Sequence, residues 1–536
     1  MNLADLETPV ETTPQTVRDW IDRAAAQHPE KSYIVETEDG RRITYGEFQR
    51  LTRQVGTFLR RQGIGTNGRV ALLCENSIEH LACYFGVIGY GATICTIHVE
   101  MNRRHFADIF ARLKPDLVVY QSGLGLEDLV EDVAAPHFVL GRWDRPQPHD
   151  FFGQVAQCRP DVAHVSTAGP RDDAVIFFTS GTDAHPKGVV LSYREHLGNI
   201  IPTAAGFGIT GNDIVYDFRS LNWASAQLLG AMVPLSCGAT LVLARKFSVS
   251  RYFQHIRQHG ATVAAGNPTT INMLLNSETD AHRDNLPSLR FITSSSAPLL
   301  LDEWRRFEER FSIPVMQGYG SSETGWIAAQ SPDICRFGTV GKPLAYHRLA
   351  IVNAAGEPLP QGQIGSVEIG CFAGNDYRYL AEDGSIKMNA RERVKTGDLG
   401  FLDSEGYLHL TGREKELIIR GGVNISPLEI DSLLMQRADL IEAATVGVPH
   451  EIYGEEVVCY VVPRPGSAIE ADELLRYCNA TLPAFKAPKQ ILFSQQLPKN
   501  ERGKLDRKAL VELWRTTFRT SHEPSEGLIP SRPTPR

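Results

Sequence analysis

Short apolar runs alternate with amphipathic stretches along most of this chain, and that alternation limits the folds open to it. Strand-like runs stand at RVALLC (69–74), DLVVY (116–120), AVIFF (174–178), ATLVLA (239–244) and ATVAAG (261–266). Between them, residues 46–63 carry apolar side chains at helical spacing and end at a glycine: Phe48, Leu51, Val55, Phe58, Leu59 and Gly63. The pattern predicts an α/β fold in which helices cover parallel sheets.

The chain is too long for one hydrophobic core. Its 536 residues predict at least two domains. Near residue 400 the pattern changes to short strands (AATVGV, EEVVCYVV, ILFSQQ) around one helical segment, ADELLRYCNATL. We therefore expect a large N-terminal domain of helix-covered sheets over residues 1–412 and a small α+β domain over residues 413–515. Residues 516–536 are rich in proline, serine and charge, and we expect them to form a disordered tail.

Composition and charge restrict the class of protein. Hydrophobic residues make up 42% of the chain and charged residues 22%, which is typical of globular proteins. The net charge of −8 argues against a general nucleic-acid binder. The chain has no apolar run long enough for a membrane span, and its first residues are unlike a signal peptide, so we expect a cytoplasmic protein. Nine cysteines without a CxxC pair indicate reduced thiols, none assigned to metal or catalysis.

The segment TSGTDAHPKGVV (179–190) directly follows the apolar run AVIFF. A loop rich in hydroxyls and glycine after a buried strand is typical of a phosphate cradle, although such a turn can also be an ordinary loop. The spacing is similar to a Walker A loop, but Pro186 precedes Lys187, and Gly188 stands where Mg²⁺ would need a hydroxyl. We predict a different phosphate loop, with nucleotide contacts from Thr179, Ser180, Gly181, Thr182 and Lys187. Ser192 and Glu195 have the spacing of a capping box and predict the start of the next helix.

Four further sequence motifs follow the phosphate loop along the chain. They are QGYGSSETG (317–325), VKTGDLG (394–400), LTGREKELIIRGGVNISPLEI (410–430) and LPKNERGKLDRKAL (497–510). Together with the phosphate loop, they resemble the adenylate-forming (AMP-binding) superfamily, and within it the acyl-CoA synthetase branch. The resemblance implies a mobile C-terminal domain and a two-step reaction. A carboxylate first attacks the α-phosphate of MgATP to give an acyl-adenylate and pyrophosphate, and the thiol of CoA then displaces AMP.

The resemblance also implies roles for individual residues. Tyr319 would stack on adenine, Glu323 would bind Mg²⁺, and Asp398 would accept hydrogen bonds from the ribose with support from Arg413. Lys504 would neutralise charge that develops at the α-phosphate. The remaining nucleotide contacts would come from Ser296, Ala297, Pro298, Gly318, Gly320, Ser321 and Ser322. Lys415 would be the hinge of the small domain, and a strand with Gly421 and Gly422 would line the tunnel for the thiol arm.

The acid would lie against Arg219, Trp223, Asn267, Ser294 and Ser295, with Trp223 as an aromatic gate. This wall is more polar than a long-chain fatty acid needs, and we hypothesise an acid with a polar or cyclic scaffold. The expected partners are a small carboxylic acid, ATP and CoA, with a carrier protein as a further possibility, no nucleic acid and no membrane span. A stand-alone adenylation enzyme that loads an amino or aryl acid onto a carrier protein is one alternative. A nucleotide-binding protein without turnover is another.

The phosphate loop departs from the family pattern at Asp183 and Ala184, which stand where Thr and Gly are usual. A carboxylate beside a triphosphate is repulsive. We therefore expect Asp183→Thr to lower the KM for ATP, measured by pyrophosphate release. An unchanged or higher KM would contradict this reading of the loop.

Overall fold

The computed structural model divides into two units, Met1–Leu410 and Thr411–Arg536. It describes residues 16–161, 166, 168–179, 186–371, 376–390, 393–499 and 504–519. The division falls inside strand β21 (Leu408–Arg413), whereas the boundary expected from the sequence followed residue 412.

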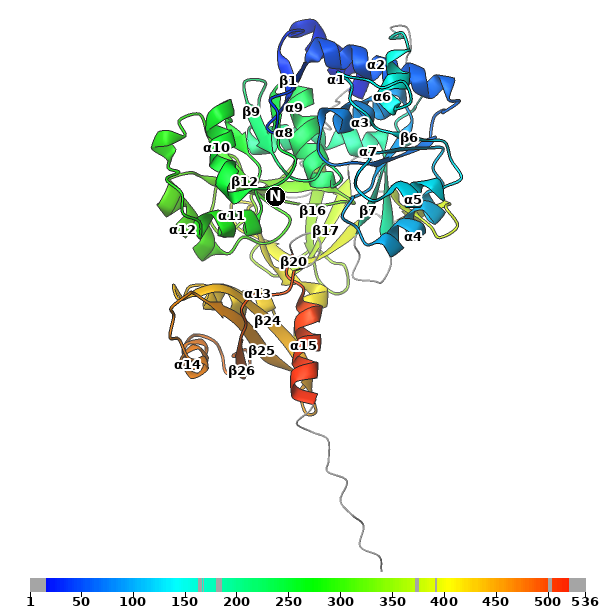
Figure 1. Ribbon diagram of the computed structural model, residues 1–536. Coiled ribbons are helices and arrows are strands. Elements are labelled where there is room, and N and C mark those ends of the chain that lie inside the picture. Colours follow the sequence, from blue (N-terminus) through cyan, green and yellow to red (C-terminus); the bar gives the residue numbers. More distant parts are fainter. Residues whose placement is uncertain are drawn as a thin grey trace, which may run out of the picture. The chain divides into compact units, whose positions relative to one another are not determined.

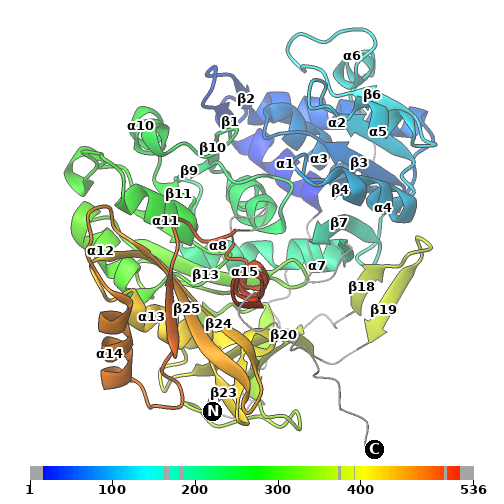
Figure 2. The same ribbon diagram turned by 60° about the horizontal axis from the view of Figure 1, so that its bottom comes forward.

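An eight-stranded sheet lies in the first unit in the order β19-β18-β8-β7-β4-β3-β5-β6. Its parallel strands are β3 (Arg69–Leu73), β4 (Thr93–Thr96), β5 (Leu117–Tyr120), β6 (His137–Val139) and β7 (Asp173–Thr179). Antiparallel pairing adds β8 (Lys187–Ser192), β18 (Asp376–Leu380) and β19 (Ile386–Ala390). Figure 2 shows the β18–β19 hairpin at the sheet edge near α4 (Arg103–Leu113). Lys114, at the end of that helix, donates a hydrogen bond to the carbonyl of Asp383 in the hairpin turn.

Helices cover both faces of this sheet. Along β3, Val70 and Leu72 pack into a cluster with α2 (Tyr45–Arg61) and α3 (Ile78–Tyr90), while Ala71 and Leu73 pack into a cluster with α4. Successive side chains of a strand point to opposite faces, so a strand covered on both sides must be apolar throughout. The predicted helix over 46–63 is confirmed as α2. Its five predicted apolar residues are all buried, and a capping box at Thr44 and Glu47 fixes its start.

A nine-stranded sheet is the second large layer, in the order β15-β14-β13-β12-β11-β9-β10-β1-β2. Its strands are β1 (Ser32–Glu36), β2 (Arg42–Thr44), β9 (Ile214–Asp217), β10 (Thr240–Leu243), β11 (Val263–Ala264), β12 (Phe291–Ser294), β13 (Val315–Ser321), β14 (Gly325–Ala329) and β15 (Lys342–Pro343). Helices α10 (Val249–His259), α11 (Pro268–Leu275) and α12 (Leu301–Phe311) flank it (Figure 1). The α/β prediction is therefore confirmed.

The other helices of this unit are short. They are α1 (Val17–Gln27), α5 (Glu127–Glu131), α6 (Phe151–Ala156), α7 (Tyr193–Gly198), α8 (Ile200–Phe207), a π-helix (Ala226–Met232) and α9 (Val233–Cys237). A third sheet is antiparallel and contains β16 (His347–Val352), β17 (Gly365–Cys371), β20 (Val394–Leu402) and β21 in the order β16-β17-β20-β21.

The second unit is built on one sheet with three helices. Its strands are β22 (Ile418–Arg420), β23 (Val423–Ile425), β24 (Leu440–His450), β25 (Gly454–Pro463) and β26 (Gln490–Phe493), and its helices are α13 (Pro427–Leu434), α14 (Ala471–Thr481) and α15 (Arg507–Arg519). Leu510 of α15 packs with Val446 and Tyr460 in the core. The disordered tail was predicted to begin at 516, which is wrong because α15 continues to Arg519. Residues 520–536 lie outside the described chain.

Eight cysteines of the described chain are free thiols, as the sequence pattern predicts. Cys74, Cys83 and Cys95 are fully buried beside the eight-stranded sheet, and burial raises the pKa of each thiol. Cys335 is more exposed, with a pKa raised to about 11. Within the described helices, none combines the length and hydropathy of a membrane span.

Candidate active site

Most of the predicted site residues of the first unit lie where parallel strands of the nine-stranded sheet end. Strands β9, β11, β12 and β13 run parallel to one another, so their carboxyl ends meet at one edge. The segments that leave this edge begin at Phe218, Ala265 and Ser295, and β13 itself carries Gly318 to Ser321. Open α/β sheets bind ligands at this kind of edge. The structure therefore brings the predicted acid and nucleotide segments together, and the role of each residue stays a prediction.

Tyr319 and Asp398 are in direct contact. The phenol of Tyr319, on β13, donates a hydrogen bond of 2.5 Å to Oδ2 of Asp398, on β20. Asp398 is 7% exposed, and its backbone N–H donates to Oγ1 of Thr396 at 3.1 Å. This bond joins the predicted adenine contact to the predicted ribose contact, two residues that lie on different sheets.

The β13–β14 hairpin carries Ser322 and Glu323 at its tip, both half-buried. Ser321 Oγ and Thr324 Oγ1 lie 3.0 Å apart across the base of the tip. The described chain has no group of three or more His, Cys, Asp and Glu side chains that could hold a metal. A lone carboxylate at Glu323 fits Mg²⁺, which commonly takes one or two protein carboxylates and completes its shell with phosphate oxygens and water.

The predicted phosphate loop joins two antiparallel strands. Thr179 at the end of β7 pairs with Lys187 at the start of β8, while Ser180 to Ala184 lie outside the described residues. Helix α7 begins only at Tyr193, where Ser192 and Glu195 form the predicted capping box. The loop consequently does not open into a helix N-terminus, and phosphate binding here would rest on loop groups and Lys187.

Packing explains two residues of this segment. Lys187 Nζ lies 3.6 Å from the ring centroid of Tyr379, on the neighbouring strand β18. A Cβ at Gly188 would stand 3.0 Å from Cβ of Leu380 and 3.2 Å from the ring of Phe178. Close strand packing thus favours a glycine at the position that breaks the Walker A pattern.

Trp223 stacks on His98, with ring centroids 4.8 Å apart and an interplanar angle of 24°. Sequence reasoning missed His98. The available signal was its position two residues after the carboxyl end of β4, which ends at Thr96. The π-helix Ala226–Met232 follows Trp223 and was also missed. Such helices are rare and concentrate at functional sites.

Arg219 forms a buried ion pair with Asp217. Its Nε lies 3.0 Å from Oδ1 and its Nη2 lies 2.6 Å from Oδ2, and the two residues are 8% and 0% exposed. The third nitrogen, Nη1, is buried and has no hydrogen-bond partner among the described residues. Nearby in sequence, the same is true of Asn222 Oδ1. The role of Arg219 toward the acid stays a prediction, and Asp217 already balances the charge of its guanidinium.

The segment after β12 carries two more buried polar groups. The hydroxyls of Ser294 and Ser295 are buried without a hydrogen-bond partner in the part of the chain that the structure describes. Ser296 has a φ of 77°, a left-handed conformation that costs a non-glycine residue roughly 1–3 kcal/mol and is common at functional sites. Asn267 caps helix α11, since its Oδ1 accepts from the N–H of Thr270 at 2.8 Å.

In the second unit, Gly421 and Gly422 form the two-residue turn between β22 and β23. Their φ values are +58° and +83°, and Arg420 pairs with Val423 across the turn. The prediction that they lie in a strand is wrong, because positive φ at both positions is the demand of a tight hairpin turn. Lys415 lies in a 3₁₀ turn, Glu414–Glu416. Arg413 ends β21, and Lys504 directly precedes the bridge between Lys499 and Leu505.

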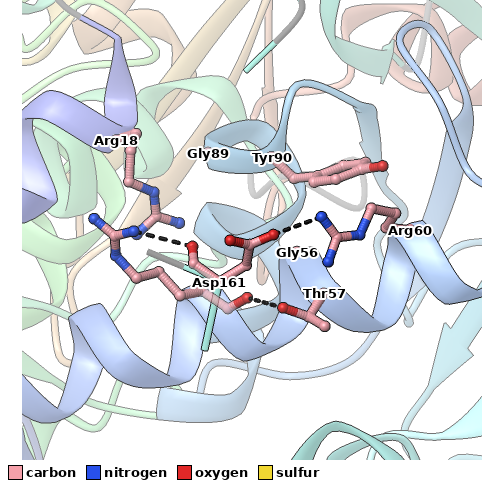
Figure 3. A pocket seen from close by; sticks show the side chains of 8 residues that line it. Arg18, Gly56, Thr57, Arg60, Gly89, Tyr90 and Asp161 are labelled. Atoms are coloured by element: carbon pink, nitrogen blue, oxygen red, sulfur yellow. Dashed lines mark hydrogen bonds and ion pairs between the residues drawn. The ribbon is translucent and has the colours of Figure 1, made fainter. Parts of the chain in front are cut away.

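A separate cluster of charges lies among α1, α2 and α3 (Figure 3). Arg60 pairs with the carboxylate of Asp161 at 2.5 Å, and Arg53 donates to the Asp161 carbonyl at 3.0 Å and to Asp22 at 2.6 Å. Burial lowers the pKa of Arg18 to about 10. The space between these side chains has room for little more than a water molecule. We interpret this cluster as a structural contact that holds α1, α2 and α3 together.

Comparison with known proteins agrees with this geometry. The family model for "AMP-binding enzyme" matches residues 21–371, and that for "AMP-binding enzyme C-terminal domain" matches residues 429–504. The sulfoacetate–CoA ligase of Cupriavidus necator is 30% identical over 504 residues, which cover 91% of this chain and 96% of that enzyme. The oxalate–CoA ligase of Arabidopsis thaliana is 29% identical over 463 residues, 84% of this chain and 89% of that enzyme.

Among solved structures, ATP-bound MatB from Rhodopseudomonas palustris superimposes with a TM-score of 0.84 at 26% identity. The match covers 94% of this chain and 100% of MatB.

The Tyr319–Asp398 bond is open to a direct test. Tyr319→Phe keeps the ring and removes the donor to a carboxylate, an interaction worth about 1.5–3 kcal/mol. We expect the KM for ATP to rise about tenfold or more, measured by pyrophosphate release. Tyr90→Phe is the matched control, because the Tyr90 hydroxyl donates to the carbonyl of Ile64 within the same unit. Equal KM values for the two variants would contradict a role in nucleotide binding.

Proposed function

This chain belongs to the AMP-binding enzyme family and is an AMP-forming acid–CoA ligase, and we propose that its acid is short and carries a second oxygen-bearing group. The observation that carries this proposal is the buried Asp217–Arg219 pair with its unpartnered Nη1. The acid must be adenylated before a thiol can attack it. A carboxylate is a poor electrophile, and joining it to AMP turns one of its oxygens into a good leaving group.

The first step makes a bond between the carboxylate oxygen and the α-phosphorus and breaks the bond to the bridging oxygen of pyrophosphate. Tyr319 and Asp398 would hold adenosine, Lys187 and the loop hydroxyls would hold the phosphates, and Lys504 would offset charge at the α-phosphate. Glu323 would hold Mg²⁺, which supplies charge neutralisation to the phosphates when bound. In the second step the sulfur of CoA bonds to the acyl carbon, AMP leaves, and the thiol proton passes to solvent.

The electrostatics of Arg219 favour a particular kind of acid. Asp217 engages Nε and Nη2, so the pair has little net charge, while Nη1 still offers directional N–H donors. A neutral pair of this kind selects an acceptor oxygen more than a negative charge. A plain alkyl chain would leave Nη1 without a partner at a cost of about 1–3 kcal/mol. The sulfoacetate and oxalate ligases, whose acids carry a second oxygen-rich group, support this choice.

Product analysis tests the function. We expect the purified protein, MgATP and CoA to give AMP and an acyl-CoA when matched acids are compared by mass spectrometry: acetate with sulfoacetate, propionate with malonate, and butyrate with succinate. The oxygen-bearing member of each pair should react faster. Faster turnover of the alkyl acids would overturn the proposed acid class. Acyl-adenylate without thioester would instead indicate a carrier-protein acceptor.

Arg219 supplies the residue-level prediction. Removing it alone would leave Asp217 buried and unpaired, so the informative variant is the charge-balanced double change Asp217→Asn/Arg219→Gln. We expect kcat/KM for the oxygen-bearing acid to fall about tenfold or more, while that for the alkyl acid falls less. Arg219→Lys should behave similarly, because an ammonium lacks the planar fork. Equal losses for both acids would argue against selection by Arg219.

Lys504 separates the two half-reactions. We expect Lys504→Ala to slow acyl-adenylate formation by about 10²-fold or more, because a cation at the reacting phosphate is lost. Thioester formation from supplied acyl-adenylate and CoA should remain within about threefold of the parent enzyme. Equal losses in both assays would contradict a role confined to adenylation.

A further inference from the structure

A buried asparagine forms two hydrogen bonds to the base of the hairpin that carries Glu323. Asn199 lies between α7 and α8 and is 1% exposed. Its Oδ1 accepts from the N–H of Trp326 at 2.8 Å, and its Nδ2 donates to the carbonyl of Trp326, also at 2.8 Å. The side-chain amide therefore pairs with the backbone of β14 as a neighbouring strand would. Few side-chain contacts fix a backbone position from both its donor and its acceptor.

The approach of Asn199 requires the glycine beside it. A Cβ on Gly325 would lie 2.6 Å from Oδ1 of Asn199, closer than any side chain could be tolerated, and the φ of Gly325 is +67°. The ring of Trp326 packs edge-on against Phe207 of α8, with centroids 5.2 Å apart. Helix α8 and Asn199 thus both contact Trp326 and fix the position of the start of β14. Strand β14 begins at Gly325, two residues after Glu323.

The orientation of the amide is itself fixed. Thr203 Oγ1 lies 2.6 Å from the carbonyl oxygen of Asn199 and 3.1 Å from its Oδ1, and Nδ2 lies 3.3 Å from Nε2 of His347. Burial lowers the pKa of His347 to about 4, so the imidazole beside the amide is neutral at physiological pH. The Trp326 N–H on the oxygen side and the Trp326 carbonyl on the nitrogen side fix the orientation of the Asn199 amide.

We propose that Asn199 is a positioning residue that sets the location of the Glu323 carboxylate for the adenylation step. The tip of the hairpin has only Ser322 to Thr324 between paired residues, Ser321 and Gly325, so a displaced β14 would carry Glu323 with it. Asn199 touches no reacting atom and acts through Trp326. The inference rests on the proposed function, because Glu323 matters only if MgATP is the substrate.

The test compares the two half-reactions in Asn199→Ala. We expect the rate of acyl-adenylate formation to fall about tenfold or more, and the Mg²⁺ concentration for half-maximal rate to rise several-fold. Thioester formation from supplied acyl-adenylate and CoA should change less than about twofold. An unchanged Mg²⁺ dependence, or equal losses in both half-reactions, would overturn the proposal. A milder variant, Thr203→Val, removes the hydroxyl that contacts both the carbonyl oxygen and Oδ1 of Asn199, and it should give the same pattern at smaller size.

Asn76→Ala is the matched comparison. Asn76 is 6% exposed, and its amide donates to the carbonyls of Arg219 and Ala244 and accepts from the N–H of Leu221. Its loss should raise the KM for the acid and leave the Mg²⁺ dependence unchanged. The same profile in Asn76→Ala and Asn199→Ala would mean general loosening and would overturn positioning. If the parent enzyme forms no acyl-CoA, the proposed function fails; if it does and Asn199→Ala matches it, only this inference fails.

Discussion

Burial of parallel strands on both faces is the constraint on which the first unit depends. Strands such as β3 and β7 sit between helix layers, so the side chains along their buried middle, 70–73 and 174–178, are apolar, and their backbone groups must be paired within the sheet. Polar chemistry is then confined to the places where strands end. That is why residues far apart in sequence, from Arg219 to Tyr319, converge at one edge of the nine-stranded sheet.

The polar groups at that edge are not fully satisfied by the protein itself. Buried atoms without a described hydrogen-bond partner include Arg219 Nη1, Asn222 Oδ1 and the hydroxyls of Ser294 and Ser295. Each such atom costs about 1–3 kcal/mol in an interior. Natural proteins keep this cost where a ligand offsets it, and the left-handed Ser296 beside them stores strain in the same segment. The proposed acid would supply hydrogen-bond partners for these atoms.

Local patterns were readable from the sequence because they depend on neighbours in the chain. The stripe of α2, the apolar strands, and the capping box at Ser192 and Glu195 all follow from spacings of four residues or fewer. What escaped depends on distant partners or on dihedral angles. The place of His98 in the site follows from the stacking of its ring on Trp223, which the sequence does not show. The reason for a glycine at position 188 follows from the packing of β18 beside β8. A double glycine fits either a strand or a turn, and only the φ values of Gly421 and Gly422 decide.

The burial of the cysteines has a consequence for enzyme assays that use thiol reagents. Thiolate, not thiol, is the species that reacts with alkylating and disulfide reagents. Cys74, Cys83 and Cys95 are both inaccessible and held in the protonated form by burial. We expect these three cysteines to react slowly with a chromogenic thiol reagent added to the folded protein, and among the eight described cysteines Cys335 is the exposed one. These buried thiols would therefore add little signal to an assay that follows CoA consumption with such a reagent.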